Sequence, residues 1–495
     1  MSINKIIIVG GGSAGWMTAA TLIKFFPQKQ ITVIESPDVP VIGVGESTIL
    51  QITEWLRSLN IKEEDFMKHT DASYKLSIKF TDFYLKGEAF HYPFGTPNFE
   101  NNFSNFNDWW FKKFYNPKTP YSDFADCMFP QMGYVNNNTY DKKIPAAYHF
   151  DAIKFGIWLK DYYCIPKGVK YIKEDIVDIS LNENGISKLN NKHEADLFID
   201  CTGFKSLLIN KLEIPFENLT DLLPNNSAWA TQIPYKNKKK ELVSYTNSTA
   251  YNNGWIWNIP LWSRIGTGYV YSDKFVSDED ALKEFKQFLG NEDLNFKKIK
   301  MRTGVYKKIW HKNVCAIGLA AGFIEPLESN GLYSVHEFVH ILVRNLQREY
   351  VSQFDKDNFN YNCKCIFYNF AEFVAMHYAM SHRTDTEYWK NNFNKEWSKE
   401  VVERIPTLTN GMLSLINNRS FDYNFYNWGH ACIAAGMHWS PTDVATLLKL
   451  NNRTLESFEH DWEVVTSLLN KKKFKWNEEA KKAKSLYEVL NEYHK

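Results

Sequence analysis

The N-terminal segment constrains the fold most strongly, because an apolar run, a glycine turn and a helix-forming stretch follow one another within residues 5–26. Residues 6–9 are continuously apolar, which is typical of a strand buried on both faces. Gly10, Gly12 and Gly15 then have the spacing of a turn whose backbone approaches a pyrophosphate. Glu35 ends the next apolar run, where its carboxylate can accept hydrogen bonds from ribose hydroxyls. The segment therefore predicts a βαβ unit that binds an adenine dinucleotide.

The following residues favour FAD over a nicotinamide dinucleotide. A nicotinamide dehydrogenase normally completes a second mononucleotide-binding half within about 100 residues, whereas residues 85–145 are rich in aromatic and turn-forming residues. Further buried strands are predicted at 197–200 and near 316, and glycines follow both of them. Strands near residues 5, 198 and 316 that converge on glycines are typical of FAD-binding oxygenase-type folds.

The predicted fold class is α/β, an FAD-binding Rossmann-like oxygenase-type fold with a mostly helical C-terminal substrate subdomain. Apolar residues recur at helical spacing in 332–350, 362–382 and 442–450. We expect residues 1–345 to form the FAD-binding module, with 85–145 an aromatic-rich insertion that forms part of the substrate pocket. Residues 346–495 are expected to form the helical subdomain packed on that module.

The charge balance and the cysteines exclude several classes of protein. Lys and Arg number 58 against 57 Asp and Glu, so nothing indicates a nucleic-acid partner or an acidic membrane surface. No run of about 18 apolar residues predicts a membrane span. The seven cysteines contain no CxxC pair, which favours a reducing, cytoplasmic location. His336, His377 and His382 form no recognisable ligand set, so we expect no metal, and His377 is interpreted as a core histidine.

Several motifs together carry a resemblance to a known family. The motifs are GVGEST at 43–48, SIKF containing Lys79, YHFDA at 148–152, DLFIDCTGF at 196–204, GWIWNIPL at 254–261, GFIEPLESNG at 322–331 and FVAMHYAMSHRTDTEYW at 373–389. With them, the sequence resembles the flavin-dependent halogenases of the tryptophan-halogenase type over nearly the whole chain. We expect a phage-encoded or marine-bacterial member with a relaxed substrate range, because the heavy use of Asn, Lys, Phe and Tyr is typical of an AT-rich genome such as a viral one, and the departures from the tryptophan-specific pattern concern the substrate.

The resemblance implies a reaction and a set of partners. In this family FADH₂, O₂ and halide give hypohalous acid, which a lysine guides to an aromatic ring. Here Lys79 matches that lysine, and a carboxylate beside it, Glu328, would orient the halogen donor and accept the proton. No pyridine-nucleotide module is visible, so FADH₂ would come from a separate NAD(P)H-dependent flavin reductase. We also expect a homo-oligomer.

The resemblance also assigns the other site residues. The flavin would be held by Gly10, Gly12, Ser13, Ala14, Gly15, Glu35, Gly45 and Gly318. The halide would be held by the backbone amides of Asn330 and Gly331, where glycine leaves room for an anion. The substrate pocket would include Tyr92, Phe94 and Ser329, and Trp255, Trp257 and Pro260 would shield the flavin side. Glu325 receives no role and is interpreted as a solvated loop carboxylate.

Three departures concern the substrate and the halide. The histidine of the family's His-Pro-Phe-Gly stretch is displaced here to His91, although Phe94 is kept. The lid segment that holds free tryptophan is shortened to NNRSFDYNF at 417–425, and Asn330 stands where threonine is usual. Free tryptophan is therefore a doubtful substrate, and an indole or phenol is favoured, with bromide or iodide preferred over chloride.

Two other classes of protein stay open at this point. A flavin-dependent aromatic monooxygenase would hydroxylate instead, although Lys79 and the WxWxIP sequence at 255–260 disfavour it. A non-catalytic flavin-binding protein would not need both Lys79 and Glu328. On base rates alone, Lys79 would be a solvated strand lysine and the two tryptophans ordinary core residues.

Overall fold

The computed structural model describes residues 2–37, 45–98, 107–398, 401, 428–439 and 455–495. A six-stranded sheet forms the N-terminal part, in the order β19(Trp310–His311)-β20(Val314–Ala316)-β11(Leu197–Asp200)-β1(Lys5–Val9)-β2(Gln30–Glu35)-β8(Lys170–Lys173). Its five strands from β20 to β8 run parallel. The predicted strands near residues 5, 198 and 316 are therefore neighbours, which confirms the α/β, FAD-binding fold class.

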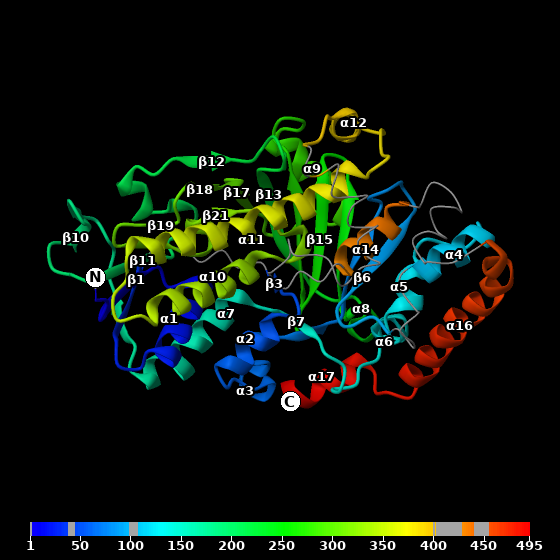
Figure 1. Cartoon of the computed structure of the whole chain (residues 1–495), viewed down its shortest axis with the longest axis horizontal. Coiled ribbons are helices and arrows are strands. Elements are labelled where there is room, and N and C mark those ends of the chain that lie inside the picture. Colours follow the sequence, from blue (N-terminus) through cyan, green and yellow to red (C-terminus); the bar gives the residue numbers. More distant parts are fainter. Residues whose placement is uncertain (1, 38–44, 99–106, 399–400, 402–427, 440–454) are drawn as a thin grey trace.

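A second sheet of seven strands lies beside the first (Figure 1). Its order is β17(Lys297–Lys300)-β13(Ser227–Ile233)-β16(Ile265–Tyr271)-β15(Gly254–Pro260)-β14(Tyr245–Tyr251)-β5(Ser77–Thr81)-β6(Ala89–Pro93). All pairs are antiparallel except β14 with β5. A small sheet, β3(Glu46–Ser47)-β7(Ala147–Phe150)-β4(Ser73–Lys75), connects to it through the chain at 75–77. The WxWxIP strand therefore lies two strands from the strand of Lys79.

The helices pack against these sheets or against one another. Those before residue 300 are α1(Ser13–Phe25), α2(Ile52–Ser58), α3(Glu63–Phe66), α4(Asn107–Tyr115), α5(Asp123–Met128), α6(Gln131–Asn137), α7(Ala152–Trp158), α8(Lys238–Glu241) and α9(Asp278–Leu289). The later ones are α10(Gly331–Leu346), α11(Gln353–Ala379), α12(Glu387–Asn394), α14(Trp428–Gly436), α16(Leu455–Lys481) and α17(Leu486–His494). Two smaller sheets, β12(Phe216–Asn218)-β18(Gly304–Tyr306)-β21(Gly322–Phe323) and β9(Ile179–Asn182)-β10(Gly185–Leu189), contain the other strands.

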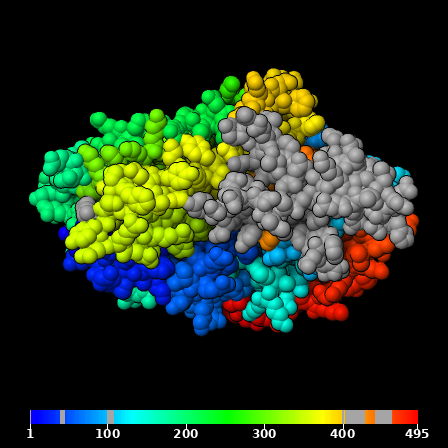
Figure 2. Space-filling model, in the orientation of Figure 1, coloured from blue at the N-terminus to red at the C-terminus, as the bar shows by residue number. Residues whose placement is uncertain are grey.

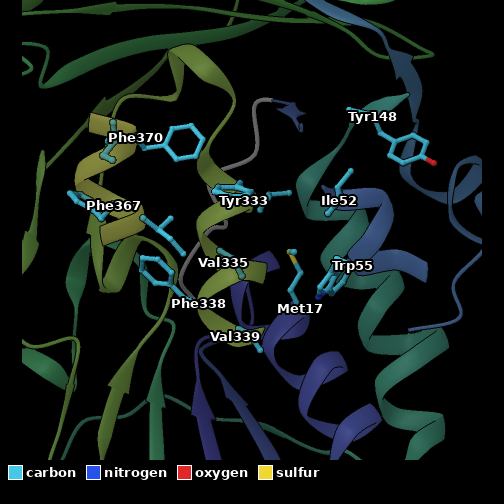
Figure 3. Close-up of a cluster of buried hydrophobic side chains, with 14 of the residues drawn as sticks. Met17, Ile52, Trp55, Tyr148, Tyr333, Val335, Phe338, Val339, Phe367 and Phe370 are labelled. Atoms are coloured by element: carbon cyan, nitrogen blue, oxygen red, sulfur yellow. The ribbon is translucent and has the colours of Figure 1, made fainter. Parts of the chain in front are cut away.

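Helix α10 lies in the core between α1 and α11 (Figure 3). Val335 lies on the side of Met17, and Phe338 lies on the side of Phe367. In Figure 2 the yellow-green and yellow residues of this helical layer form the left and central part of the face shown, above the blue N-terminal residues. The described segments after residue 346 are helical, and the proposed division at residue 345 stays a prediction. No helix among the described residues is long and apolar enough to cross a membrane.

Candidate active site

The glycine turn after β1 leaves no room for side chains. Gly10 has φ +114°, and a Cβ there would lie 2.2 Å from the Cys201 carbonyl oxygen. A Cβ on Gly15 would lie 1.9 Å from the Gly10 carbonyl oxygen, so α1 begins directly against β1. Oε2 of Glu35 is buried and has no hydrogen-bond partner within the described residues. A ribose hydroxyl would supply that donor, so this turn fits an adenine dinucleotide such as FAD.

The other predicted flavin residues surround the same turn. Gly12 is the N-cap of α1, and Ser13 begins the helix with its hydroxyl donating to the Ala152 carbonyl at 2.7 Å. The Ser13 hydroxyl is therefore engaged within the protein, and it is the backbone amide of Ser13 that could bind an anion at the helix start. A Cβ on Gly318 would meet the Cβ of Ala14 at 2.9 Å, so the third strand also ends against the turn. Gly45, with φ +88°, immediately precedes β3.

Lys75 is the lysine in the centre of the site. It ends β4, is 0% exposed, and donates from Nζ to the Ser329 hydroxyl at 2.7 Å and to the Thr48 carbonyl at 2.9 Å. Nζ also lies 4.6 Å from the ring centroid of Phe94. Burial holds the pKa of Lys75 well below its ordinary value, although Glu328 and then Glu46 act in the opposite direction. Lys75 is thus a buried amine that faces the aromatic ring of the predicted pocket.

Glu328 forms a close pair with His377 from helix α11. Glu328 is 1% exposed, and its Oε1 lies 2.9 Å from His377 Nε2. Nδ1 of His377 lies 3.2 Å from the backbone carbonyls of Phe373 and Val374, which requires a proton on Nδ1. Burial raises the pKa of Glu328, while His377 and Lys75 lower it. Glu328 and His377 therefore form a close buried pair beside Lys75, and His377 has a specific partner that its place in an apolar helix does not indicate.

The prediction that Lys79 lies beside Glu328 is wrong. Lys79 is paired with His91 across β5 and β6, and it is half-buried. Because side chains alternate along a strand, Lys79 and Phe80 project from opposite faces of β5. The Phe80 ring lies 4.7 Å from the ring of His377, so Lys79 points away from the Glu328–His377 pair. Lys75 takes the predicted place next to Glu328.

The predicted pocket residues do come together around Lys75. Tyr92 and Phe94 meet edge to face at 5.5 Å between ring centroids, and Tyr92 also meets Phe373 of α11 at 6.3 Å. Burial raises the pKa of Tyr92 well above its usual value, and the charge of Glu328 adds to this. A Cβ on Gly429, in α14, would lie 2.7 Å from the Tyr92 hydroxyl. Segments from four separate regions of the chain therefore pack together in one aromatic cluster.

The predicted halide residues begin helix α10. Asn330 is the N-cap and Gly331 is the first helical residue, and the amides of a first turn have no partner within their own helix. A Cβ on Gly331 would lie 2.7 Å from Oε1 of Glu46, so the Glu46 carboxyl group lies directly against the start of α10. Burial raises the pKa of Glu46 to about 7, and Lys75 opposes this. The start of α10 is therefore a feasible anion site with a titratable carboxyl group beside it.

Glu325 is not a solvated loop carboxylate, contrary to its interpretation from sequence. It is 0% exposed, and Oε2 accepts hydrogen bonds from Trp255 Nε1 at 2.6 Å, Asn225 Nδ2 at 2.8 Å and the Tyr378 hydroxyl at 2.9 Å. The reason is packing between distant segments, since β15, α11 and the loop before α10 meet at this carboxylate. Glu325 therefore fixes the first tryptophan of the WxWxIP strand to the loop that carries Glu328.

The other residues of the WxWxIP sequence are also buried, except for the half-buried Asn258. The rings of Trp255 and Trp257 lie 6.1 Å apart on one face of β15, and the Trp257 ring covers Gly268, where a Cβ would lie 2.1 Å from it. The Pro260 carbonyl accepts a hydrogen bond from the Ser73 hydroxyl. Their predicted role in shielding the flavin stays a proposal. The shortened lid at 417–425 lies outside the described residues.

Comparison with known proteins identifies the family. A family model described as tryptophan halogenase matches residues 5–452. The chain belongs to the tryptophan halogenase family. It is 34% identical to the 7-chloro-L-tryptophan 6-halogenase KtzR of Kutzneria sp. (strain 744), over 81% of this chain and 84% of that protein. It is 32% identical to the tryptophan 7-halogenase RebH of Lentzea aerocolonigenes, over 89% of this chain and 90% of the relative.

Solved structures agree with this assignment. The apo structure of VirX1 has a TM-score of 0.88 and 36% identity, and covers 99% of both chains. The tryptophan 6-halogenase SttH of Streptomyces toxytricini has a TM-score of 0.86 at 30% identity, also with 99% of both chains covered. This halogenase is therefore an oxidoreductase that uses FADH₂ and halide, and flavin-dependent halogenases work with a separate flavin reductase and an aromatic substrate. The hydroxylase alternative is not favoured.

We expect Glu325 to be essential for the stability of this halogenase. Glu325→Leu should lower the free energy of unfolding by about 2–4 kcal/mol, because three buried donors lose their shared acceptor. Glu325→Gln, which keeps an acceptor oxygen, should cost less. Urea denaturation followed by tryptophan fluorescence measures both values. Equal stability of Glu325→Leu and the wild type would show that the carboxylate does not hold these segments together.

Proposed function

We propose that this halogenase uses Lys75 and Glu328 to direct hypohalous acid onto an electron-rich aromatic ring of the indole or phenol type. The observation that carries the proposal is the position of Lys75 Nζ, which lies 2.7 Å from the Ser329 hydroxyl and 4.6 Å from the Phe94 ring centroid. Lys75 replaces Lys79 in the predicted role. When bound, reduced flavin supplies the hypohalous acid together with O₂ and halide.

The environment of Lys75 suits this role. Because burial lowers its pKa, Nζ can be present as a neutral amine, which is a nucleophile toward an electrophilic halogen. In its ammonium form the same nitrogen can donate a hydrogen bond to the hypohalous acid and polarise it. Ser329 and Thr48 hold the nitrogen in place in either form.

Glu328 and His377 provide the acid–base function. Aromatic substitution releases a proton from the ring carbon, and a carboxylate within reach of that carbon can accept it. The 2.9 Å contact between Glu328 Oε1 and His377 Nε2 offers the proton a second acceptor. His377 is a positioning residue in this scheme, because the carboxylate lies between it and Lys75.

The pocket supports an aromatic substrate, and the names of the relatives point to indoles. Tyr92, Phe94 and Phe373 present ring faces and edges at one site, and the relatives KtzR and RebH are named as tryptophan halogenases. Free tryptophan is proposed to be a poor substrate because of the shortened lid sequence. Cytoplasmic location, a homo-oligomeric state and flavin shielding by Trp255 and Trp257 are further proposals.

The test is an incubation of the protein with FAD, a flavin reductase, NADH and each halide against a panel of indoles and phenols, with free tryptophan included. Mass spectrometry should show monohalogenated indoles or phenols. A hydroxylated product in the presence of halide, or free tryptophan as the best substrate, would contradict the proposal.

We expect the halogenase to use bromide or iodide more efficiently than chloride. Bromide and iodide are easier to oxidise, and backbone amides at the start of α10 select poorly by ion size. Asn330 stands where threonine is usual in the family, and its Oδ1 is buried without a hydrogen-bond partner in the described part of the chain. Competition at equal halide concentrations measures the preference, and a product pool dominated by chlorinated compounds would refute it.

The pH should control halide use through Glu46. Below its pKa of about 7 the Glu46 carboxyl group is protonated, and above that value it carries a negative charge close to Gly331. We therefore expect the KM for bromide to rise by roughly tenfold as the pH increases through this range. The Glu46→Gln variant should have a flat profile. An identical pH dependence in Glu46→Gln would exclude Glu46 as the group responsible.

A further inference from the structure

Helix α10 carries a His-Glu-x-x-His sequence, HEFVH at 336–340, that the halogenation site does not use. His336 and His340 are one helical turn apart, so their imidazoles lie on the same face, as two zinc ligands on a helix require. One ligand atom each from His336, Glu337 and His340 lies within 4.8 Å of the other two. We propose that these three side chains form a binding site for a divalent transition-metal ion, of which Zn²⁺ is the best match.

Two imidazole nitrogens of this cluster have no hydrogen bond from any described residue. They are Nδ1 of His336 and Nε2 of His340, and both are buried. Nδ1 of His336 lies 3.2 Å from Glu337 Oε1, so these two possible ligand atoms already lie side by side. Buried imidazole nitrogens normally have a partner. A cation between the three side chains would accept both nitrogen lone pairs and the carboxylate charge.

The surroundings leave the cluster accessible. The neighbouring positions Val335 and Phe338 face α1 and α11 (Figure 3), whereas the side chain of Glu337 is 18% exposed. His336 is 1% exposed, and the ring of Tyr333 meets it edge to face at 5.3 Å. Arg344, a positive charge one helical turn beyond His340, is exposed. Its side chain can therefore extend into solvent and leave the cluster open to a cation. An ion can therefore enter from the Glu337 side while His336 remains fixed.

The ligand set selects the kind of metal. Two imidazoles and one carboxylate leave the fourth tetrahedral position of Zn²⁺ to a water molecule. Bonds of about 2.0–2.2 Å place tetrahedral ligand atoms about 3.4 Å apart, so modest side-chain rotations are enough to close the site. Ca²⁺ and Mg²⁺, which prefer oxygen ligands, are disfavoured. This proposal replaces the expectation from sequence that the protein has no metal site.

The test uses the full chain, freed of any affinity tag and treated with chelator. Titration calorimetry with Zn²⁺ should give one site per chain, and Co²⁺ should give the visible absorption of a four-coordinate ion. His340→Gln combined with Glu337→Gln should weaken Zn²⁺ binding by more than about tenfold, since even indirect partners of a metal contribute about 10- to 100-fold. Both side chains are half-buried, so this variant is expected to fold.

A matched control is His311→Gln, which removes a half-buried histidine outside the cluster and should leave Zn²⁺ affinity unchanged. Zn²⁺ should raise the Tm of the wild type and of His311→Gln but not that of the double variant. Equal Zn²⁺ affinity in the double variant and the wild type would overturn the proposal. No binding to the wild type at roughly a hundred micromolar Zn²⁺ would also overturn it.

Discussion

Lys75→Ala should lower halogenation of a bound arene by about 10²- to 10⁴-fold, while Lys79→Ala should remain close to the wild type. The two lysines are four residues apart in SYKLSIKF, but only Lys75 reaches Ser329 and Phe94. Lys79 lies beside His91 instead. Product formation per unit time, measured by mass spectrometry with bromide and an indole, gives both rates.

Two controls separate the chemistry of Lys75 from its packing. Lys75→Met keeps most of the buried volume, so it should fold and bind FAD like the wild type and yet fail to halogenate. FAD affinity, measured by fluorescence quenching, should be unchanged in all three variants. If Lys79→Ala lost activity and Lys75→Met retained it, the assignment of the catalytic lysine would be wrong.

Glu328→Gln should reduce halogenation by about a hundredfold, because an amide can still orient a donor but cannot take the ring proton. Glu328 is buried beside His377, so the substitution removes the carboxylate that faces His377 Nε2. The loss should appear in kcat, with the KM of the arene changed little.

His377→Asn supplies the comparison for Glu328→Gln. If the histidine acts by positioning and by sharing the proton, its loss should be smaller than that of Glu328→Gln and should shift the pH dependence of kcat. A Glu328→Gln enzyme with wild-type kcat would exclude the carboxylate as the proton acceptor.

The sequence predicted the flavin-binding part well because its signals are local. The glycine spacing, the apolar run of β1 and the acid at Glu35 depend on neighbouring residues and on the geometry of one turn. The strand 197–200 was predicted at the bounds that the structure has. Helical spacing likewise located α10 and most of α11.

The errors concern contacts between distant segments. Two lysines occur in SYKLSIKF, and only the alternation of β5 together with the place of α11 decides which one faces Glu328. Glu325 was interpreted as a loop carboxylate because the sequence does not show that Trp255 of β15 and Tyr378 of α11 donate hydrogen bonds to it. The HEFVH sequence could have been found by its spacing alone, since it needs no knowledge of the fold.

The distribution of ring positions in the product tests the central claim most directly. With bromide and an indole that offers several reactive positions, the wild type should brominate one position predominantly, because Lys75 and the pocket fix the ring relative to the halogen donor. Lys75→Met, supplied with the same reductase and FAD, should give at most the isomer mixture that free hypobromous acid produces. The same single isomer from Lys75→Met at the wild-type rate would contradict the proposal that Lys75 guides the halogen.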